Sequence, residues 1–408
     1  MVTAMDERSE KVSQLKAELA GALERSEFQL HYQPVVALDR DQIVGFEALL
    51  RWMHPSRGVV YPGEFLPLVE SGGQMVPLTR WIIGEVCRQL ERWQSALKRT
   101  RPLIISTNFP VQCLADEELM REVRKLLSSP KIPVGSLWFE INEAEIFPQS
   151  ELIARSWPAL QEMGIGVVID EFGFEYASLR HLTSYRACAL KMSRSLVTAL
   201  GRDPSNNSLA QTVIWLGASL GIEVIAKGVE KAEQLRAIRE LQCPYAQGFY
   251  FWPPQDPDAA FLAYSESSNR EAAAPPDVAR LQPFGIFEGL RAEELQQIAE
   301  NCKELIVPED TLLIRQGQVG TRVYLLEEGT VSIYKGSGEI HQFLRTVAAP
   351  AVIGEMAAAD PERIRTANVR SLQDLRLLSL SLADFLLFLR RFPTLGSNLR
   401  KLLEQRAR

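Results

Sequence analysis

The feature that most restricts the fold of this chain is a series of eight short apolar runs, separated mainly by longer stretches of helical pattern. The runs cover residues 28–33, 43–50, 103–107, 137–141, 166–169, 189–192, 223–226 and 247–251. Eight strands that alternate with helices over about 250 residues are the number expected of a TIM-like (β/α)8 barrel in the α/β class. Only about nine residues separate the first two runs, too few for a helical crossover, so we expect the barrel to begin with an antiparallel pair.

The pattern on either side of these runs divides the chain into three parts. An amphipathic helix over residues 10–25 precedes the first run, and we assign residues 1–263 to the barrel. Residues 264–283 are rich in Ser, Ala, Pro and Glu, which is typical of an exposed linker. Residues 284–408 contain a short helix at 291–302, several short strands with glycines between them, and a helical pattern over 382–406. This order predicts an antiparallel β-roll or jelly roll.

Composition excludes several classes of protein. The chain is 46% hydrophobic and 24% charged with a net charge of −6, so no overall basic field attracts nucleic acid or anionic lipid. No apolar run reaches the roughly 18 residues of a membrane span, and the first residues lack an apolar signal core. The five cysteines are scattered without CxxC spacing, which argues against zinc and disulfides. We therefore expect a cytoplasmic protein with neither a nucleic-acid nor a membrane partner.

Polar residues follow or end the apolar runs, where the strands of a barrel converge on one face. In chain order they are Glu47, Asn108, Glu140, Asp170, Glu171, Lys191 and Gln247. A single residue of this kind is ordinarily a solvated strand end. Oxygen ligands from four strand ends on one rim are what Mg²⁺ or Mn²⁺ prefers, so the pattern predicts a binding site.

The same segments carry a family resemblance. YQPVV at 32–36 and FEALLRW at 46–52 are followed by STNFPVQCL, WFEINE, VVIDEFG, LKMS, IAKGVE and AQGFYFWPP. In order and spacing, residues 20–262 resemble the EAL family of cyclic di-GMP phosphodiesterases. In active members of that family, two metal ions polarise a phosphodiester and activate a water molecule.

The resemblance implies a role for each matching position. Ligands of the first Mg or Mn ion would be Glu47, Asn108, Glu140 and Asp170. Lys191 would steady the attacking water or a phosphate oxygen, and Glu143 would brace the loop after Asp170. Positions that contact the dinucleotide would be Gln33, Leu49, Arg51 and Gln247.

The chain departs from the family pattern around the second metal. Glu171 replaces the second of two successive aspartates, and Phe174 and Glu175 replace a small residue and a glycine. Ser193 stands where the family has an aspartate, and Lys227 where it has the glutamate that binds the second metal. Two carboxylate positions and the intervening loop therefore differ, which argues against a Mg or Mn cofactor and against turnover.

The change at Lys227 reverses the sign of a charge. An ammonium about 4 Å from a divalent ion repels it by roughly 8 kcal/mol at an effective dielectric near 20. We expect Lys227 to pair with Asp170 or with a ligand phosphate; the alternative is a salt bridge to Glu171 in a site without ligand. Two possibilities for the barrel remain open. It binds cyclic di-GMP, or it has become a surface for an unidentified protein partner.

A second motif lies in the C-terminal part. Gly354 and Glu355 precede a short helical stretch, and Arg365 arrives just before a strand. Such turns present N–H groups to a phosphate, and arginine grips it with two hydrogen bonds. Residues 284–400 resemble the cyclic-nucleotide-binding family of catabolite activators and protein kinase A regulatory subunits. The resemblance implies that Glu355 binds the ribose 2′-hydroxyl and Arg365 the cyclic phosphate of cAMP or cGMP, with cAMP favoured.

The remaining residues of that pocket would be Gly354, Met356 and Thr366. The alternative is a roll domain with a decayed pocket, which only packs or dimerises. The whole chain is then a signalling receptor, in which the roll senses a cyclic mononucleotide and the barrel binds cyclic di-GMP or a protein. One rival is an active phosphodiesterase gated by a cyclic mononucleotide, and another is a scaffold with two non-binding pockets. Both families often pair through helices, which leaves a homodimer open.

Overall fold

The computed structural model describes residues 14–19, 21–96, 102–146, 148–173, 187–200, 204–268, 276–337, 340–360 and 362–407. The chain forms two compact units, Met1–Ala260 and Phe261–Arg408. The first unit is the predicted barrel. The second is the predicted roll.

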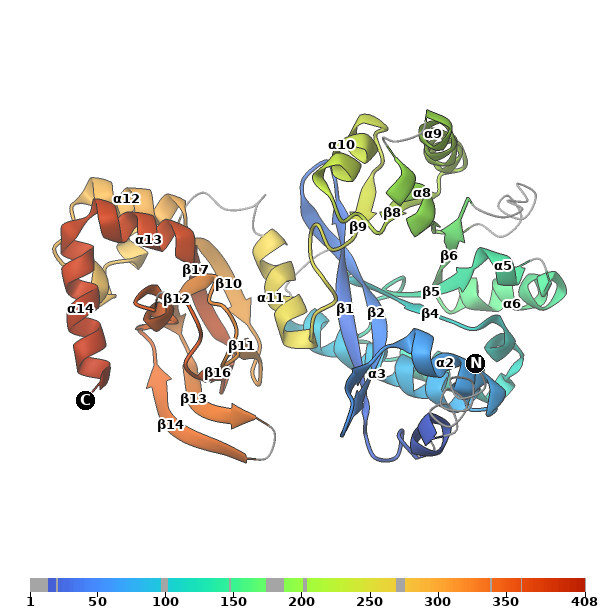
Figure 1. The fold of residues 1–408 in the computed structure, drawn as a ribbon, viewed down its shortest axis with the longest axis horizontal. Coiled ribbons are helices and arrows are strands. Elements are labelled where there is room, and N and C mark those ends of the chain that lie inside the picture. Colours follow the sequence, from blue (N-terminus) through green and yellow to red (C-terminus); the bar gives the residue numbers. More distant parts are fainter. Residues whose placement is uncertain are drawn as a thin grey trace, which may run out of the picture. The chain divides into compact units, whose positions relative to one another are not determined.

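The first unit contains a closed eight-stranded barrel (Figure 1). Its strands are β1 (Phe28–Ala37), β2 (Gln42–His54), β4 (Ile104–Asn108), β5 (Leu137–Asn142), β6 (Gly166–Phe172), β7 (Ala189–Met192), β8 (Glu223–Lys227) and β9 (Tyr245–Gln247). From β2 through β9 each strand runs parallel to the next, whereas β1 runs antiparallel to both β2 and β9. The predicted antiparallel start of the barrel is therefore confirmed. A short strand, β3 (Gly58–Val60), extends β2 on the outside of the ring.

The strand register brings polar side chains to one rim. Asn108 of β4 lies opposite Glu140 of β5, and Lys227 of β8 lies opposite Gln247 of β9. On the antiparallel side of the barrel, Gln33 of β1 lies opposite Glu47 of β2. Because side chains alternate between the two faces of a strand, these groups all point into the barrel at the same level.

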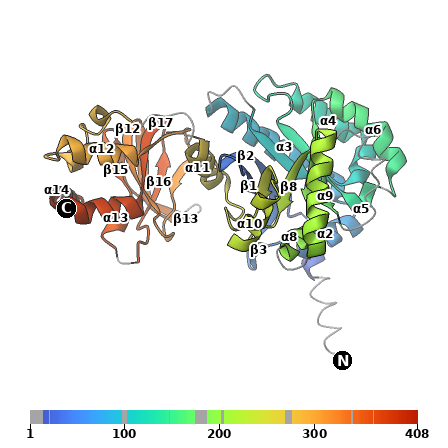
Figure 2. The same ribbon diagram turned by 90° about the horizontal axis from the view of Figure 1, so that it is seen from above.

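Helices cover the outside of the barrel (Figure 2). They are α2 (Pro62–Ser71), α3 (Met75–Ala96), η1 (Val111–Ala115), α4 (Glu117–Leu127), α5 (Glu143–Ile146), α6 (Ser150–Glu162), α8 (Arg194–Ala199), α9 (Pro204–Leu220) and α10 (Ala232–Glu240). Helix α4 shows how the sequence sets such an element. The Asp116 carboxylate accepts a hydrogen bond from the Leu119 N–H at 2.8 Å and caps the helix. Leu119 and Val123, four residues apart, are the buried face.

Two predicted boundaries in the first unit are wrong. The strand expected at 247–251 is β9, which begins two residues earlier, at Tyr245, and ends at Gln247. It ends there because the chain turns at Gly248, where a Cβ would lie 2.0 Å from the Val229 carbonyl oxygen. The expected N-terminal helix is seen at 14–19, whereas residues 21–26 form a turn with Gly21 at φ +77 and Ser26 at φ 56. Residues 10–13 of that prediction lie outside the described residues.

The expected linker at 264–283 is also wrong in part. Helix α11 (Pro257–Ser268) continues through its first five residues, and η2 (Val278–Arg280) lies near its end. Tyr264, Ser265 and Ser267 are buried although the stretch is rich in serine, and Leu262 belongs to the core of the second unit. Residues 269–275 lie outside the described residues.

The second unit is a roll of two four-stranded sheets, β10-β17-β12-β15 and β11-β16-β13-β14. The strands are β10 (Lys303–Val307), β11 (Leu312–Ile314), β12 (Arg322–Glu328), β13 (Thr330–Ser337), β14 (Ile340–Ala348), β15 (Ala351–Ile353), β16 (Asn368–Ser371) and β17 (Leu375–Ser381). Every pairing between them is antiparallel, as the sequence predicts.

Helical elements complete this unit, with α12, α13 and α14 together on one side of it (Figure 1). They are η3 (Gly285–Phe287), α12 (Ala292–Glu300), η4 (Glu355–Ala358), α13 (Leu382–Arg391) and α14 (Pro393–Ala407). The expected helical stretch at 382–406 is two helices, because Pro393 cannot continue α13. Among the described residues of the whole chain, none of the helices is long and apolar enough to cross a membrane.

Candidate functional site

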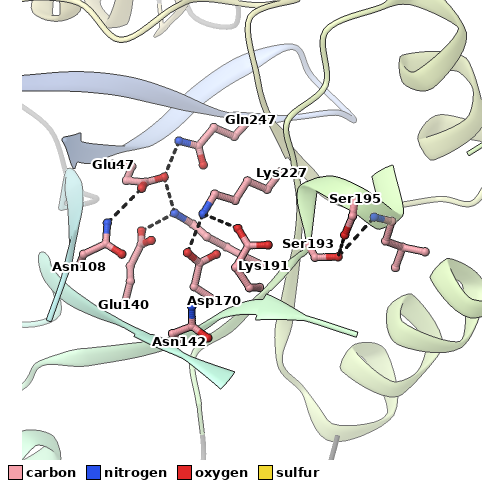
Figure 3. Close-up of polar contacts among 12 residues, drawn as sticks. Glu47, Asn108, Glu140, Asn142, Asp170, Lys191, Ser193, Ser195, Lys227 and Gln247 are labelled. Atoms are coloured by element: carbon pink, nitrogen blue, oxygen red, sulfur yellow. Dashed lines mark hydrogen bonds and ion pairs between the residues drawn. The ribbon is translucent and has the colours of Figure 1, made fainter. Parts of the chain in front are cut away.

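The rim of the barrel gathers the polar residues that the sequence singled out (Figure 3). Glu47 lies at its centre and is almost wholly buried. One carboxylate oxygen, Oε2, accepts hydrogen bonds from Lys191 Nζ and from Gln247 Nε2, both at 2.8 Å. The other, Oε1, accepts a long bond from Asn108 Nδ2 at 3.4 Å. Strands β2, β4, β7 and β9 therefore meet at one carboxylate.

Lys191 joins two acidic side chains inside the barrel. Its ammonium donates to Glu47 and, by a very short contact, to Glu140. Burial alone would lower the pKa of Lys191, but the carboxylates of Glu140 and Glu47 outweigh burial and raise it. Burial would likewise raise the pKa of Glu47, yet Lys191 and Lys227 lower it to about 2. The pKa of Glu140 shifts in the opposite direction, because burial and the neighbouring Glu47 charge raise it to about 7.

Lys227 forms a second ion-pair group beside the first. Its Nζ lies 2.6 Å from Asp170 Oδ2 and 3.2 Å from Glu171 Oε1. Burial opposes the charge, but Glu47 and Asp170 raise the pKa of Lys227, so the side chain stays protonated. Both alternatives that the sequence left open for an unliganded site therefore occur together, with Asp170 as the closer partner.

A backbone irregularity brings Asp170 and Glu171 to the same lysine. The register of β6 against β7 shifts between Ile169 and Phe172, and Glu171 has φ 56, a left-handed conformation that is uncommon outside glycine. Without this bulge, successive side chains would point to opposite faces of the strand. Glu143 accepts a hydrogen bond from the Gly173 N–H at 3.2 Å, in line with the expected brace. Phe174 and Glu175 lie outside the described residues.

The expected metal ligands lie on one rim but do not form a metal centre. In the part of the chain that the structure describes, no group of three or more Asp, Glu, His or Cys side chains is placed to hold an ion. Two ammonium groups occupy the space between the carboxylates, and Ser193 is turned away to cap α8 through the Leu196 N–H at 3.3 Å. The residues present therefore do not fit a pair of divalent ions.

The residues expected to contact a dinucleotide line the same rim. Gln247 Nε2 donates to Gln33 Oε1 at 3.1 Å, and Gln33 Nε2 donates to the Trp252 carbonyl at 3.2 Å. Arg51 lies with its guanidinium 5.1 Å from the centre of the Tyr61 ring, and Leu49 on the same strand is half-buried. Sequence reasoning missed Tyr61, whose only signal is an exposed aromatic residue just before a proline.

The second candidate site is the turn between β15 and β16. Gly354 has φ +85, and a Cβ there would lie 2.5 Å from Arg365 Nη1, so glycine is required by both conformation and space. Arg365 donates to the Gly354 carbonyl at 2.8 Å and to the Arg322 carbonyl at 2.5 Å. Its guanidinium is buried and already bonded to main-chain oxygens, an arrangement that the sequence did not predict.

Glu355 has a charged partner that sequence reasoning also missed. Its Oε1 accepts a very short hydrogen bond from Arg406 of α14, which also donates to the Val352 carbonyl at 2.7 Å. The other oxygen, Oε2, is buried without a hydrogen-bond partner among the described residues. Met356 and Thr366 are exposed, with the Thr366 hydroxyl 3.9 Å from the Met356 sulfur. A free acceptor therefore lies beside the glycine turn.

Comparison with known proteins identifies a family for each of the two parts of the chain. Residues 16–254 match the EAL domain family, and residues 304–392 match the cyclic nucleotide-binding domain family. Over 252 residues the chain is 32% identical to MucR, a bifunctional diguanylate cyclase/cyclic di-GMP phosphodiesterase of Pseudomonas aeruginosa; the match covers 62% of this chain and 36% of MucR. This chain therefore spans about a third of that relative's length.

Two solved structures extend the comparison. The MucR phosphodiesterase in complex with cyclic di-GMP has a TM-score of 0.57 at 32% identity, covering 60% of this chain and 99% of that chain. The EAL enzyme Bd1971 with cAMP and cyclic di-GMP bound has a TM-score of 0.59 at 25% identity, covering 63% of this chain and 70% of that chain. Because the first family match covers more than half of the chain, the protein belongs to the EAL-domain family and carries a C-terminal cyclic nucleotide-binding domain.

Proposed function

We propose that this protein is a cytoplasmic nucleotide second-messenger receptor that does not hydrolyse cyclic di-GMP. Its C-terminal domain binds a cyclic mononucleotide, with cAMP favoured over cGMP. Its barrel binds cyclic di-GMP on the rim around Gln33, Leu49, Arg51 and Gln247. A protein partner and a homodimer are further parts of this proposal, because the two domain types often act through such contacts.

The observation that carries the proposal is the position of Lys227 between Asp170 and Glu171. Two-metal hydrolysis needs carboxylates at this place to hold an ion next to the attacked phosphorus. Here the carboxylates are neutralised by a fixed ammonium, which would repel a divalent cation. The same ammonium attracts a phosphodiester oxygen, so the change disfavours chemistry more than binding.

Binding at the rim is supported by groups that do not depend on metal. Arg51 and the paired amides of Gln33 and Gln247 are preorganised, and Arg51 is held against the Tyr61 ring. MucR and Bd1971 were both solved with cyclic di-GMP bound. Their complexes support the same ligand for this rim.

Binding in the C-terminal domain is supported by Glu355 and Gly354. The free oxygen of Glu355 can accept a bond from a ribose hydroxyl, and the N–H groups at the Gly354 turn suit a phosphate. Arg365 would have to exchange at least one main-chain bond for a phosphate oxygen. The EAL enzyme Bd1971 was solved with cAMP as well as cyclic di-GMP bound, which supports a cyclic mononucleotide as a ligand of this protein.

Calorimetry with cAMP, cGMP and cyclic di-GMP tests the proposal on the intact protein. The barrel site is supported if the protein binds cyclic di-GMP and Arg51→Ala abolishes that binding. The C-terminal site is supported if the protein binds a cyclic mononucleotide and Arg365→Ala abolishes that binding. Silence for all three nucleotides would overturn the receptor function. In that case a scaffold with two non-binding pockets becomes the better explanation.

A second candidate is an active phosphodiesterase gated by a cyclic mononucleotide. It is favoured by the retention of Glu47, Asn108, Glu140, Asp170 and Lys191 on one rim. Incubation of the protein with cyclic di-GMP and Mg²⁺ or Mn²⁺ distinguishes the two, because an active enzyme releases linear pGpG. Turnover that Glu47→Ala abolishes would favour this candidate.

A further inference from the structure

The layer of side chains directly beneath the rim includes several small residues. Stepping down two residues along each strand from the rim gives Val35, Gly45, Ser106, Trp138, Val168, Ala189, Ile225 and Tyr245. An eight-stranded barrel is ordinarily filled by layers of bulky branched side chains. Here three of the eight positions are glycine, serine and alanine.

Two of these small residues, Gly45 and Ser106, line a cavity of about 390 Å³ inside the barrel. Its walls include Val35, Gly45, Ser106, Trp138, Val168 and Ile225. The volume lies in the range of about 300 to 1,000 Å³ typical of small-molecule sites, which are mainly apolar with a few polar groups. The cavity is therefore large enough for an aromatic molecule.

The cavity opens at the face opposite the rim. Cys188, just before β7, and the exposed Glu223, the first residue of β8, both line it. Lys191, which is wholly buried, lines it at the inner end. The Trp138 ring is fixed there, because its Nε1 donates to the Gly135 carbonyl at 2.9 Å and its edge lies against Gly166, where a Cβ would come within 2.4 Å.

The charges around the cavity restrict what can enter. The Lys191 ammonium is engaged by Glu47 and Glu140, so it offers little attraction to an anion, and Glu223 would repel one at the mouth. A cation would approach the Lys191 ammonium as it moved inward. An uncharged molecule meets neither barrier and gains from covering the apolar walls.

We propose that this cavity is a binding site for a small, uncharged, mainly apolar molecule with an aromatic ring, separate from the nucleotide sites. Its entrance carries a natural reporter. Of the five cysteines, all of which lie among the described residues, Cys188 is partly accessible while the other four are buried. Cys188 also lines the cavity, so we expect a bound molecule to hinder access to its thiol.

Indole is the probe for the test, with alkylation of Cys188 by N-ethylmaleimide as the readout, followed by peptide mass spectrometry. The alkylation rate should fall by the factor 1 + [indole]/Kd, about tenfold when indole is present at about ten times its Kd. Indole-3-carboxylate, the charged analogue, should protect far less. An unchanged rate of Cys188 alkylation at saturating indole would overturn the proposal.

Two variants show whether protection comes from this cavity. Ser106→Leu fills the inner space and Val44→Trp closes the space near the mouth, so each should remove the protection by indole. Ala218→Leu adds the same bulk as the first variant on the exposed face of α9 and should keep it. If one filling variant fails to fold, the other decides. Protection that persists in a folded filling variant would place indole elsewhere and contradict the proposal.

Discussion

Lys227 Nζ lies 2.6 Å from Asp170 Oδ2, so an ammonium and a carboxylate are in direct contact where the family pattern has two carboxylates. Three further properties follow from this pair. The lysine stays charged, Asp170 has one oxygen engaged, and Glu171 is drawn to the same ammonium at 3.2 Å. Substitution of Lys227 tests this arrangement.

Lys227→Glu alone should not restore hydrolysis of cyclic di-GMP. The new carboxylate would face Asp170 and Glu171 without a counter-charge, and Ser193 would still cap α8 instead of serving the site. The expected result is no linear pGpG by chromatography, together with a lower melting temperature that Mg²⁺ partly restores. The triple variant Lys227→Glu, Glu171→Asp, Ser193→Asp is the matched comparison. Full turnover by the single variant would show that the lysine is the sole obstacle.

The stability of the protein should fall as the pH rises through neutrality because of Glu140. Its pKa is raised to about 7 in the folded state, above the usual 4.5, so the folded protein holds a proton that the unfolded chain releases. The resulting stabilisation is complete below about pH 4.5 and is lost as the pH passes 7. This stabilisation amounts to about 1 to 3 kcal/mol.

Urea unfolding of the wild type and Glu140→Gln between about pH 5 and pH 8 measures this effect. The wild type should lose stability relative to Glu140→Gln as the pH increases, since glutamine cannot titrate. Glu162→Gln, on an exposed position of α6, controls for the loss of a carboxylate elsewhere. A difference between wild type and Glu140→Gln that is independent of pH would contradict the raised pKa.

Much of the fold could be predicted from the sequence because it rests on local patterns. The alternation of apolar runs located the barrel strands, and the short connection before Ile43 revealed the antiparallel start. The pairing of Lys227 with Asp170 was also predictable, because both positions lie on strand ends that meet at one rim. Glu171 could not be placed in advance, since its left-handed backbone arises from a bulge that leaves no signature in residue type.

The contacts of the C-terminal site could not be predicted from local sequence patterns. Arg406 lies 51 residues from Glu355 in the sequence and reaches it only because α13 and α14 pack on the roll. No local pattern distinguishes Arg406 from the other basic residues of α14. In the same way, burial of α11 residues in a serine-rich stretch depends on the surface against which they pack, which is why the linker prediction began too early.

Arg406→Gln should weaken cyclic mononucleotide binding. Arg406 holds one oxygen of Glu355 and leaves the other free for a ribose hydroxyl, so its loss would let the carboxylate turn away. A hydrogen bond to a charged group contributes about 1.5 to 3 kcal/mol, which corresponds to a loss of affinity on the order of tenfold or more. Calorimetry with cAMP measures it, and Arg400→Gln on the exposed side of α14 is the control. Equal affinity of both variants would exclude the positioning role.

Gly354→Ala should destabilise the C-terminal domain. The residue has φ +85, and the new methyl group would meet Arg365 Nη1, which is held by two carbonyl oxygens. The expected loss of unfolding free energy is about 1 to 2 kcal/mol, with weaker nucleotide binding. Thermal unfolding of the intact protein measures this loss. The control is Gly285→Ala, which should be neutral because that position has free space around a Cβ and ordinary backbone angles. A neutral Gly354→Ala would show that the turn tolerates an L side chain.

The central claim is that Lys227 separates binding of cyclic di-GMP from its hydrolysis. The most direct test incubates the protein with cyclic di-GMP and Mn²⁺, with and without cAMP, and measures both bound ligand and released pGpG. We predict binding that persists in EDTA and no pGpG under any of these conditions. Release of pGpG that requires Mn²⁺, increases with cAMP and disappears in Glu47→Ala would contradict the claim.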